Sequence, residues 1–298
     1  MANEKPGKIN IESFLAAMRP PSTPNESFKR DNVDLWTIRD WKKNYAVSVL
    51  AGLSTEPNSH ANGVRLDWLQ RLVLSKSDGR RKPQPKEISR ALNAGLDQAD
   101  VLRLEDPIED LFCDLITTPR GNYRIFTGLW EAAAPYTQTL LDAFESLPPG
   151  SLKQDALTSI YSLLKLSDEI AERAKIQRST PSSGEPGGVM AVPNTGALKR
   201  LADRVRFSSA DLDRLGIDDE VLTPFLLDPV QFPHVSDREA GETPLEFHPL
   251  LAKSNGVVVV SPTNISIAVR ALLVGAAQQG RMDKAVKGAK GRAGEAWR

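Results

Sequence analysis

Apolar residues recur every three or four positions through several long stretches of this chain, a spacing that places them on one face of an α-helix. Between residues 34 and 53 the recurring positions are Leu35, Ile38, Trp41, Tyr45, Val49 and Leu53. This pattern predicts one amphipathic helix, which ends in the polar residues from Ser54 to Gly63. The same spacing predicts further helices over residues 66–73, 87–96, 130–147, 152–175, 195–206 and 265–278.

The period changes to two between residues 110 and 127, which is typical of strands. Residues 110–117 and 123–127 alternate apolar with polar side chains on either side of the turn-forming sequence PRGN, and they predict a β-hairpin. Residues 245–251 and 257–260 flank KSNG, whose Asn-Gly pair favours a tight hairpin turn. Among the caps, Ser151 is placed to begin the helix at 152. The expected fold class is therefore α+β, predominantly helical with two β-hairpins.

Four regions follow from the distribution of turn-forming and charged residues. Residues 1–30 are rich in proline, serine, asparagine and charge, so we expect a mobile N-terminal arm. Residues 31–177 form a helical domain with a β-hairpin. Residues 178–194 (RSTPSSGEPGGVMAVPN) read as a flexible linker, because Pro, Gly and Ser leave little to build a core. Residues 195–298 form a smaller α+β region that ends in a basic helix or tail.

The composition limits which compartment and which partners are expected for the protein. Of its 298 residues 40% are hydrophobic, which suits a folded globular chain. Lys plus Arg and Asp plus Glu both number 38, so any attraction to nucleic acid must come from a local patch. The N-terminus lacks a secretory signal and no apolar run is long enough for a bilayer, so we expect a cytoplasmic protein with no membrane partner. The lone cysteine, Cys113, fits a reducing compartment.

Familiar catalytic motifs are missing from the sequence. There is no G-x-S-x-G elbow, no phosphate-binding GxxxxGK[ST] loop and no GxGxxG turn. The acidic residues between 208 and 220 do not follow the spacing of a calcium loop, and His234 and His248 lack metal-ligand partners, so no metal site and no cofactor are expected. Cys113 sits in an apolar run and is interpreted as a buried hydrophobe, with a catalytic thiol as the alternative. The chain is expected to have no activity of its own, although an enzyme with an unfamiliar site is a third hypothesis.

Two basic segments are candidates for nucleic-acid binding. The first opens a helix, where lysines and backbone N–H groups can meet phosphates, and the second is the C-terminal tail. The candidate residues are Lys76, Arg80, Arg81, Lys82, Lys86 and Arg90 in the first segment, and Lys287, Lys290 and Arg292 in the second. A solvated loop is the default interpretation of the first segment, and phosphate binding is the functional one.

The last fifty residues resemble a junction in large uncharacterised bacterial proteins. FHPLL, then GVVVVSPTNISIAVRALL, lead into KGAKGRAGEAWR, much as a hydrophobic hairpin and helix there precede a restriction-endonuclease-like nuclease domain of the PD-(D/E)xK type. Lys290, Gly291 and Glu295 match a KGxxxE pattern. The resemblance implies that Glu295 is a first-helix acid that helps to hold a divalent metal. The Asp and Glu-x-Lys that should follow it are not in the chain, so the resemblance implies a non-catalytic N-terminal portion of a longer protein.

Two functional hypotheses result. The leading one is a non-catalytic recognition or scaffolding region of a larger bacterial protein, one with a nuclease used in defence, whose partner is a protein or a missing C-terminal domain. The alternative is a stand-alone nucleic-acid-binding protein that uses residues 76–90 and 281–298.

Overall fold

The structure is a computed structural model, and it describes residues 35–57, 63–94, 113–126, 133–177, 194–228 and 244–279. The predicted arm at 1–30, residues 178–193 of the predicted linker and the basic tail at 281–298 lie outside these described residues.

Helices dominate the described residues, and two small antiparallel sheets accompany them, so the predicted α+β class is confirmed. The longer helices are α3 (Lys43–Leu53), α4 (Gly63–Lys76), α5 (Pro85–Ala94), α6 (Ala133–Glu145), α7 (Ser151–Ala174), α8 (Thr195–Arg204) and α11 (Ile265–Gln279). The short helices are α2 (Leu35–Arg39), α9 (Ser209–Leu215), η4 (Asp219–Phe225), α10 (Pro244–Phe247) and η5 (Pro262–Asn264). The strands are β1 (Cys113–Thr118), β2 (Gly121–Phe126), β3 (Arg206–Phe207), β4 (Leu250–Lys253) and β5 (Gly256–Val259).

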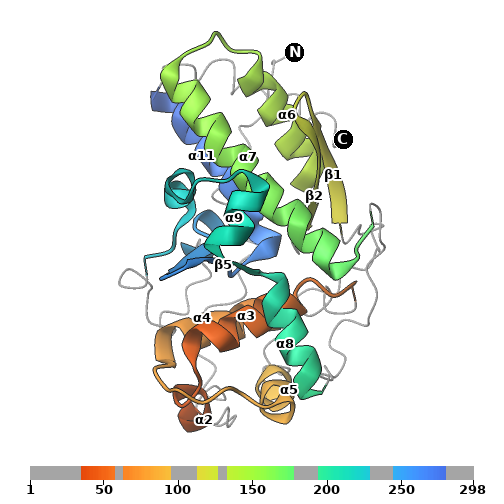
Figure 1. Ribbon diagram of the computed structural model, residues 1–298, viewed down its shortest axis with the longest axis vertical. Helices are drawn as coiled ribbons and strands as arrows, with labels where there is room; N and C mark the ends of the chain where they lie inside the picture. Colours follow the sequence, from red (N-terminus) through yellow and green to blue (C-terminus); the bar gives the residue numbers. More distant parts are fainter. Residues whose placement is uncertain are drawn as a thin grey trace, which may run out of the picture.

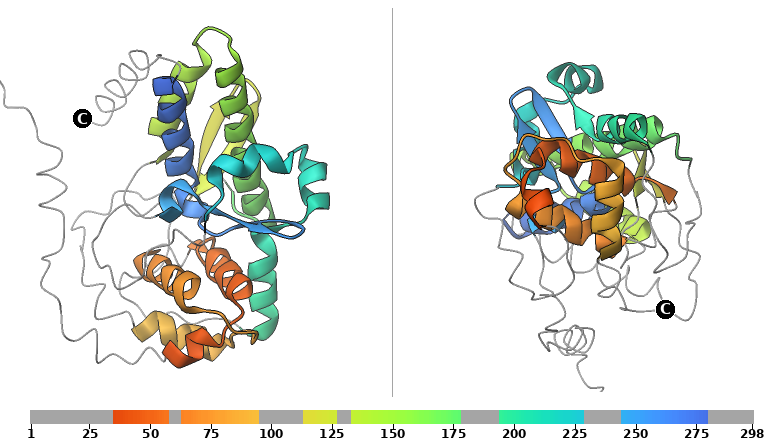
Figure 2. Two further views of the ribbon diagram at one scale, coloured as in Figure 1. Left: turned by 90° about the vertical axis from the view of Figure 1, so that its left-hand side faces the viewer. Right: turned by 90° about the horizontal axis from the view of Figure 1, so that it is seen from below.

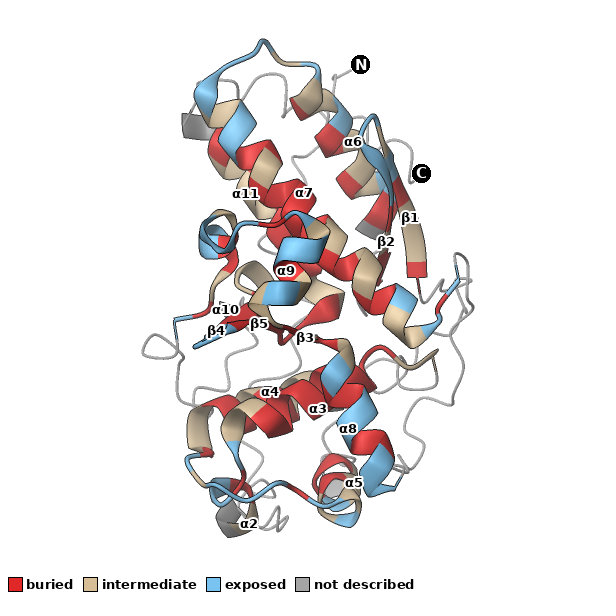
Figure 3. Ribbon diagram, in the orientation of Figure 1, coloured by how far each residue is buried: buried red, intermediate tan, exposed pale blue. Residues whose placement is uncertain are grey.

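The elements form two groups with a sheet between them (Figure 1). Helices α2 to α5 and α8 lie below, and the β1–β2 hairpin lies above with α6, α7 and α11. The sheet β3-β5-β4 lies between the groups in the side view at the left of Figure 2. Buried residues run without interruption from one group to the other (Figure 3), and they form one hydrophobic core. Elements far apart in sequence therefore meet: α8 packs on α3, and α11 packs on α6 and α7.

The helix predicted over 34–53 is wrong as a single element, because the chain breaks between α2 and α3. Trp41 forms a parallel β-bridge with Arg81. The N–H groups of Lys42 and Arg81 donate to the carbonyls of Arg81 and Asp40 at 2.6 and 3.0 Å. Backbone groups that would continue the helix are thus satisfied by the segment after α4, a long-range pairing that the local pattern does not reveal.

Helix α3 is also not amphipathic, because every residue from Tyr45 to Leu53 is buried. Its close packing on α8 depends on Gly52. A Cβ at this position would lie 2.2 Å from the carbonyl oxygen of Leu201 on α8, so only glycine permits the approach.

The first hairpin forms as predicted, with Cys113 paired to Phe126 and Thr118 to Gly121. Helical side chains close both of its outer edges. On the β1 side, Gln138 of α6 accepts from the Thr117 N–H at 2.7 Å and donates to the Thr117 carbonyl at 2.6 Å. On the β2 side, Asp168 of α7 accepts from the Arg124 N–H at 3.0 Å. These side chains take the place of neighbouring strands.

The second hairpin, β4–β5, is confirmed, but its surroundings differ from the prediction. Residues 245–247 belong to helix α10 rather than to a strand. The helix predicted over 195–206 ends at Arg204, and Arg206 and Phe207 pair with Val258 and Val257 as a third strand. A two-residue strand is too short for its period to be recognised in the sequence.

Two capping positions refine the predicted helix boundaries. Ser151 does not cap α7: the N-cap is Gly150, and Ser151 is the first helical residue. Asn194, which the prediction placed in the linker, caps α8, and its side-chain oxygen accepts from the Ala197 N–H at 3.0 Å. Asparagine at this position satisfies one of the free N–H groups of the first turn.

Candidate functional site

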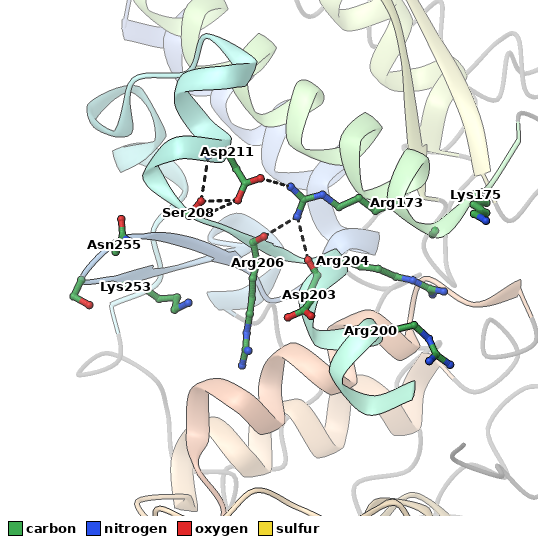
Figure 4. Close-up of a pocket in the computed structure, with 12 residues that line it drawn as sticks. Arg173, Lys175, Arg200, Asp203, Arg204, Arg206, Ser208, Asp211, Lys253 and Asn255 are labelled. Atoms are coloured by element: carbon green, nitrogen blue, oxygen red, sulfur yellow. Dashed lines mark hydrogen bonds and ion pairs between the residues drawn. The ribbon is translucent and has the colours of Figure 1, made fainter. Parts of the chain in front are cut away.

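A basic groove lies between the C-terminal end of α7, helix α8, the β3–α9 connection and the tip of the β4–β5 hairpin (Figure 4). Its volume is about 950 Å³. Six cationic side chains and two carboxylates line it, so its lining is positive although the whole chain is neutral. The lining residues are Arg173, Ala174, Lys175, Arg200, Asp203, Arg204, Arg206, Ser208, Asp211, Lys253, Ser254 and Asn255.

Local folding places these cations on the groove side of their elements. On α8, Leu198, Leu201 and Ala202 turn inward and are buried, which leaves Arg200 and Arg204, one helical turn apart, on the outer side. On β3, Phe207 enters the core, so the side chain of Arg206 leaves the opposite face of the strand.

Arg173 connects several of the elements that line the groove. It reaches from α7 to Asp211 at 2.8 Å and to Glu169 at 2.9 Å. It also donates to the backbone carbonyls of Asp203 and Arg206 at 3.1 and 2.7 Å (Figure 4). One guanidinium thus ties α7 to α8, β3 and α9, and its donors are occupied by the protein itself.

The carboxylate of Asp211 is held on both sides. Ser208 donates to it through its backbone N–H at 2.9 Å and its hydroxyl at 2.7 Å, in a capping box that starts α9. Burial raises the pKa of Asp211, but these hydrogen bonds and the charges of Arg173 and Arg214 outweigh it, so the pKa lies below its ordinary value. Asp211 is therefore a partner of Arg173 rather than a proton donor or acceptor near neutral pH.

Arg204 is held in a similar way at the lower edge of the groove. Its guanidinium forms an ion pair with Glu56 and lies 3.5 Å from the hydroxyl oxygen of Thr55, in the connection after α3. This ion pair joins α8 to the helix on which it packs.

Arg206 differs from these two arginines, because no carboxylate of the described residues lies within ion-pair distance of it. Its Nε donates to the Ser48 hydroxyl at 2.9 Å and its NH2 group to the Asn44 carbonyl at 3.3 Å. The guanidinium carbon lies 5.1 Å from the ring centre of Tyr45. Burial lowers the pKa of Arg206 by more than the negative charge of Asp203 raises it. The side chain stays charged near neutral pH, half-buried and bound only by neutral groups.

Lys253, at the end of β4, belongs to the same positive region. Partial burial lowers the pKa of Lys253, and the positive charges of Arg206 and Lys42 lower it further. Cations that lower the pKa of a neighbouring lysine in this way favour an anion between them.

The structure places the predicted basic residues of 76–90 around the α4–α5 connection. Lys82 does not line the groove, but its Nζ lies 5.1 Å from the ring centre of Tyr45, the ring that Arg206 also contacts. Arg81 instead forms an ion pair with Glu87 at 2.8 Å, and Glu87 also accepts from the Gln84 N–H at the start of α5. The other predicted residues are Lys76 at the end of α4, Arg80 in the connection, and Lys86 and Arg90 exposed on α5.

The remaining predicted residues either lie outside the described residues or occupy other parts of the fold. Lys287, Lys290, Arg292 and Glu295 lie outside the described residues, as does His234. His248 contacts the carbonyl of Pro224 at 3.2 Å. Cys113 is fully buried, and burial raises its pKa to about 12. The described residues contain no group of three or more His, Cys, Asp and Glu side chains arranged to hold a metal ion.

Sequence reasoning missed the cations that line the groove, although one signal was available. Arg200, Arg204 and Arg206 lie within seven consecutive residues, in the stretch RLADRVRF. A count of charge along 195–206 would have found this cluster. No local pattern connects it with Arg173 or Lys253, which arrive from other elements.

These features describe a mostly helical α+β protein whose candidate site is a groove lined with cations. No helix among the described residues is both long enough and apolar enough to cross a bilayer. The family described as anti-phage protein Upx-like matches residues 22–293, and the chain belongs to that family. The protein thus belongs to a family with a role in defence against phage. Comparisons with curated proteins and with solved structures gave no match.

Proposed function

We propose that this chain acts in phage defence as a recognition region without catalytic activity of its own, and that its basic groove recognises the phosphate backbone of nucleic acid. The observation that carries the proposal is Arg206, a half-buried guanidinium bound by neutral groups and surrounded by further cations. Removing a charge from water costs free energy, which a bound phosphate would offset.

The arrangement of the other cations supports the same ligand. Lys175 and Arg200 add charge along the groove, and Lys82, outside the groove lining, adds a further charge beside the ring of Tyr45. Phosphate contacts of this kind position a nucleic acid and carry no sequence information by themselves. The proposal therefore assigns backbone recognition to the groove.

The chemistry that destroys phage nucleic acid would come from elsewhere. The resemblance of the last fifty residues to proteins with a PD-(D/E)xK nuclease suggests a further domain or a partner as its source, and Glu295 as that domain's first acid. That part of the proposal stays a prediction, since Lys290 and Glu295 lie outside the described residues.

Binding of fluorescent oligonucleotides, measured by anisotropy at several salt concentrations, tests the proposal. Each phosphate contact adds about 0.7 to 0.9 to the slope of log affinity against log salt. We expect Arg200→Gln to weaken binding at low salt and to reduce this slope by about one contact. Lys199→Gln is the matched control, because Lys199 lies on the same helix, is exposed and does not line the groove.

Two further variants separate the groove from the predicted loop. Lys82→Gln should weaken binding, while Lys86→Gln, on the outer face of α5, should weaken it less. Affinity that is independent of salt and equal in all four variants would contradict nucleic-acid recognition by the groove.

A further inference from the structure

Arg206 and Lys253 leave the same face of the sheet β3-β5-β4. Arg206 pairs with Val258 on β5, and Val258 pairs with Leu251 on β4, so these three residues lie in one row across the sheet. Directly paired residues share a face, and so do residues two apart on a strand. Lys253, two residues after Leu251, is thus on the face of Arg206.

That face of the sheet lies opposite the start of α3. Arg206 donates to Ser48 and to the carbonyl of Asn44, and Asn44 belongs to the first turn of α3. Lys42 occupies the N-cap of this helix, and its side chain makes no capping hydrogen bond to the free N–H groups. A helix N-terminus carries partial positive charge, which adds to the charges of Lys42, Arg206 and Lys253.

We infer that Arg206, Lys253 and Lys42 form, with the N-terminus of α3, a subsite for a phosphomonoester dianion. This chemistry belongs to the 5′-phosphate at the end of a nucleic-acid strand and to a free nucleotide. The inference rests on the proposed function, since it assigns one class of phosphate to one part of the basic groove.

The charge of the ligand explains the choice of a monoester over an internal diester. A phosphomonoester carries nearly two negative charges at neutral pH, whereas a diester carries one, so converging cations favour the monoester. The guanidinium of Arg206 has more N–H donors than its bonds to Ser48 and Asn44 use, and its planar shape suits two phosphate oxygens at once.

The other charged groups nearby leave this positive region in place. Asp203 is the acid that acts on Arg206, and it lies beyond ion-pair distance from it. Asp211 is bound to Arg173. Tyr45 is neutral near pH 7, because burial raises its pKa.

The test compares one 3′-labelled single-stranded oligonucleotide with and without a 5′-phosphate, by anisotropy at low salt. The wild-type protein should bind the phosphorylated strand about tenfold more tightly, the value of one charge-assisted hydrogen bond. Lys253→Gln should abolish this preference, and the control Lys199→Gln should keep it. Circular dichroism establishes that both variants fold, and Lys253 is exposed on a hairpin, where a glutamine causes no clash.

A second arm separates the two sources of the phosphate. Competition by AMP, with adenosine as control, measures whether a free nucleotide displaces the phosphorylated strand. If AMP displaces the strand and adenosine does not, the result supports the subsite. Loss of this displacement in Lys253→Gln assigns the phosphate-binding position to Lys253.

The outcomes distinguish the subsite from the proposed function. Equal affinity for the two strands in the wild-type protein, with the salt dependence intact, would overturn the subsite and leave backbone recognition standing. A preference that survives in Lys253→Gln would also overturn the subsite. Failure of every strand to bind would overturn the proposed function, and calorimetry with AMP would then decide the subsite: binding lost in Lys253→Gln supports it, and no binding overturns it.

Discussion

Arg173 and Arg206 line the same groove, and their partners give them different roles. Arg173 is neutralised by Asp211 and Glu169, and it holds the backbone carbonyl of Arg206 at 2.7 Å. It therefore fixes the strand from which Arg206 projects. Arg206 is bound only by neutral groups, so it retains its charge for a ligand. At the residue scale, the difference between a structural and a binding arginine lies in the carboxylates around it.

Cys113 is expected to be unreactive in the folded protein. Burial raises the pKa of its thiol to about 12, so the thiolate that reacts with disulfide reagents is scarce near neutral pH. We expect the Cys113 thiol not to react with an aromatic disulfide reagent, as followed by absorbance at pH 8, until a denaturant unfolds the chain. Rapid labelling of the native protein would instead favour the catalytic-thiol hypothesis.

Lys175 should accept glycine with a gain in stability. It ends α7 with φ at 59°, in the left-handed region that costs residues with a Cβ about 1 kcal/mol. We expect Lys175→Gly to raise the free energy of unfolding in urea by about 0.5 kcal/mol, because glycine also loses more entropy on folding. Lys175→Ala is the control, since it removes the same charge and keeps the strain. Equal stability of the two variants would show that the backbone conformation carries no cost.

At the scale of elements, the sequence predicted where most helices and both hairpins lie, because their signals are local. The failures occur where a distant segment completes the backbone hydrogen bonds. The segment around Arg81 breaks the helix predicted over 34–53, and β5 turns Arg206 and Phe207 into a strand. The groove could not be predicted for the same reason. Lys82, from the predicted basic run, lies beside Tyr45 but does not line the groove, whereas Arg206 and Lys253 share a face only after the sheet has formed.

The close contact between β3 and β5 depends on a glycine. Gly256 has φ at 108°, and a Cβ there would lie 2.0 Å from the carbonyl oxygen of Phe207. We expect Gly256→Ala to lower the free energy of unfolding by at least about 2 kcal/mol, as measured by urea denaturation.

The matched control is Gly275→Ala in helix α11. Nothing lies within 4 Å of the added Cβ, and alanine is the better helix former, so stability should rise by about 0.5–1 kcal/mol. Two glycine-to-alanine changes with opposite signs would establish that the geometry at Gly256, and not the loss of a glycine, is responsible.

At the scale of the whole molecule, ion pairs connect elements that are separate in sequence. Glu56 joins α8 to the connection after α3, and Glu169 and Asp211 join α7 to α9 through Arg173 and Arg214. Three members of these pairs, Arg173, Arg204 and Asp211, line the groove. The pairs accompany a single hydrophobic core that includes residues of the lower and the upper helices. The stability of the molecule should therefore depend on the ionisation of these acids.

Stability is expected to fall in acid, and the direction follows from two pKa shifts. Burial raises the pKa of Glu169 and Asp211, but bonds from Arg214, Arg173 and Ser208 hold both below their ordinary values of 4.5 and 3.8. Acids with lowered pKa values in the folded state stabilise it above those ordinary values and lose this effect as pH falls through the folded pKa values.

Calorimetric unfolding tests this dependence. The Tm should stay level near neutral pH and fall steeply below about pH 4. Arg173→Gln should lower the Tm at neutral pH and flatten the acid limb, because both carboxylates lose a charged partner. An acid limb that is unchanged in this variant would contradict the role given to Glu169 and Asp211.

The sequence by itself determined the fold class, the position of most helices, both hairpins and the basic run that contains Lys82. These properties depend on side-chain period, turn chemistry and charge, which act between residues close together along the chain. The tertiary structure decided the break at Trp41, the strand at Arg206 and the groove. Each of these needs a hydrogen bond between residues that only folding brings together, as when Arg206 donates to the carbonyl of Asn44 in the first turn of α3.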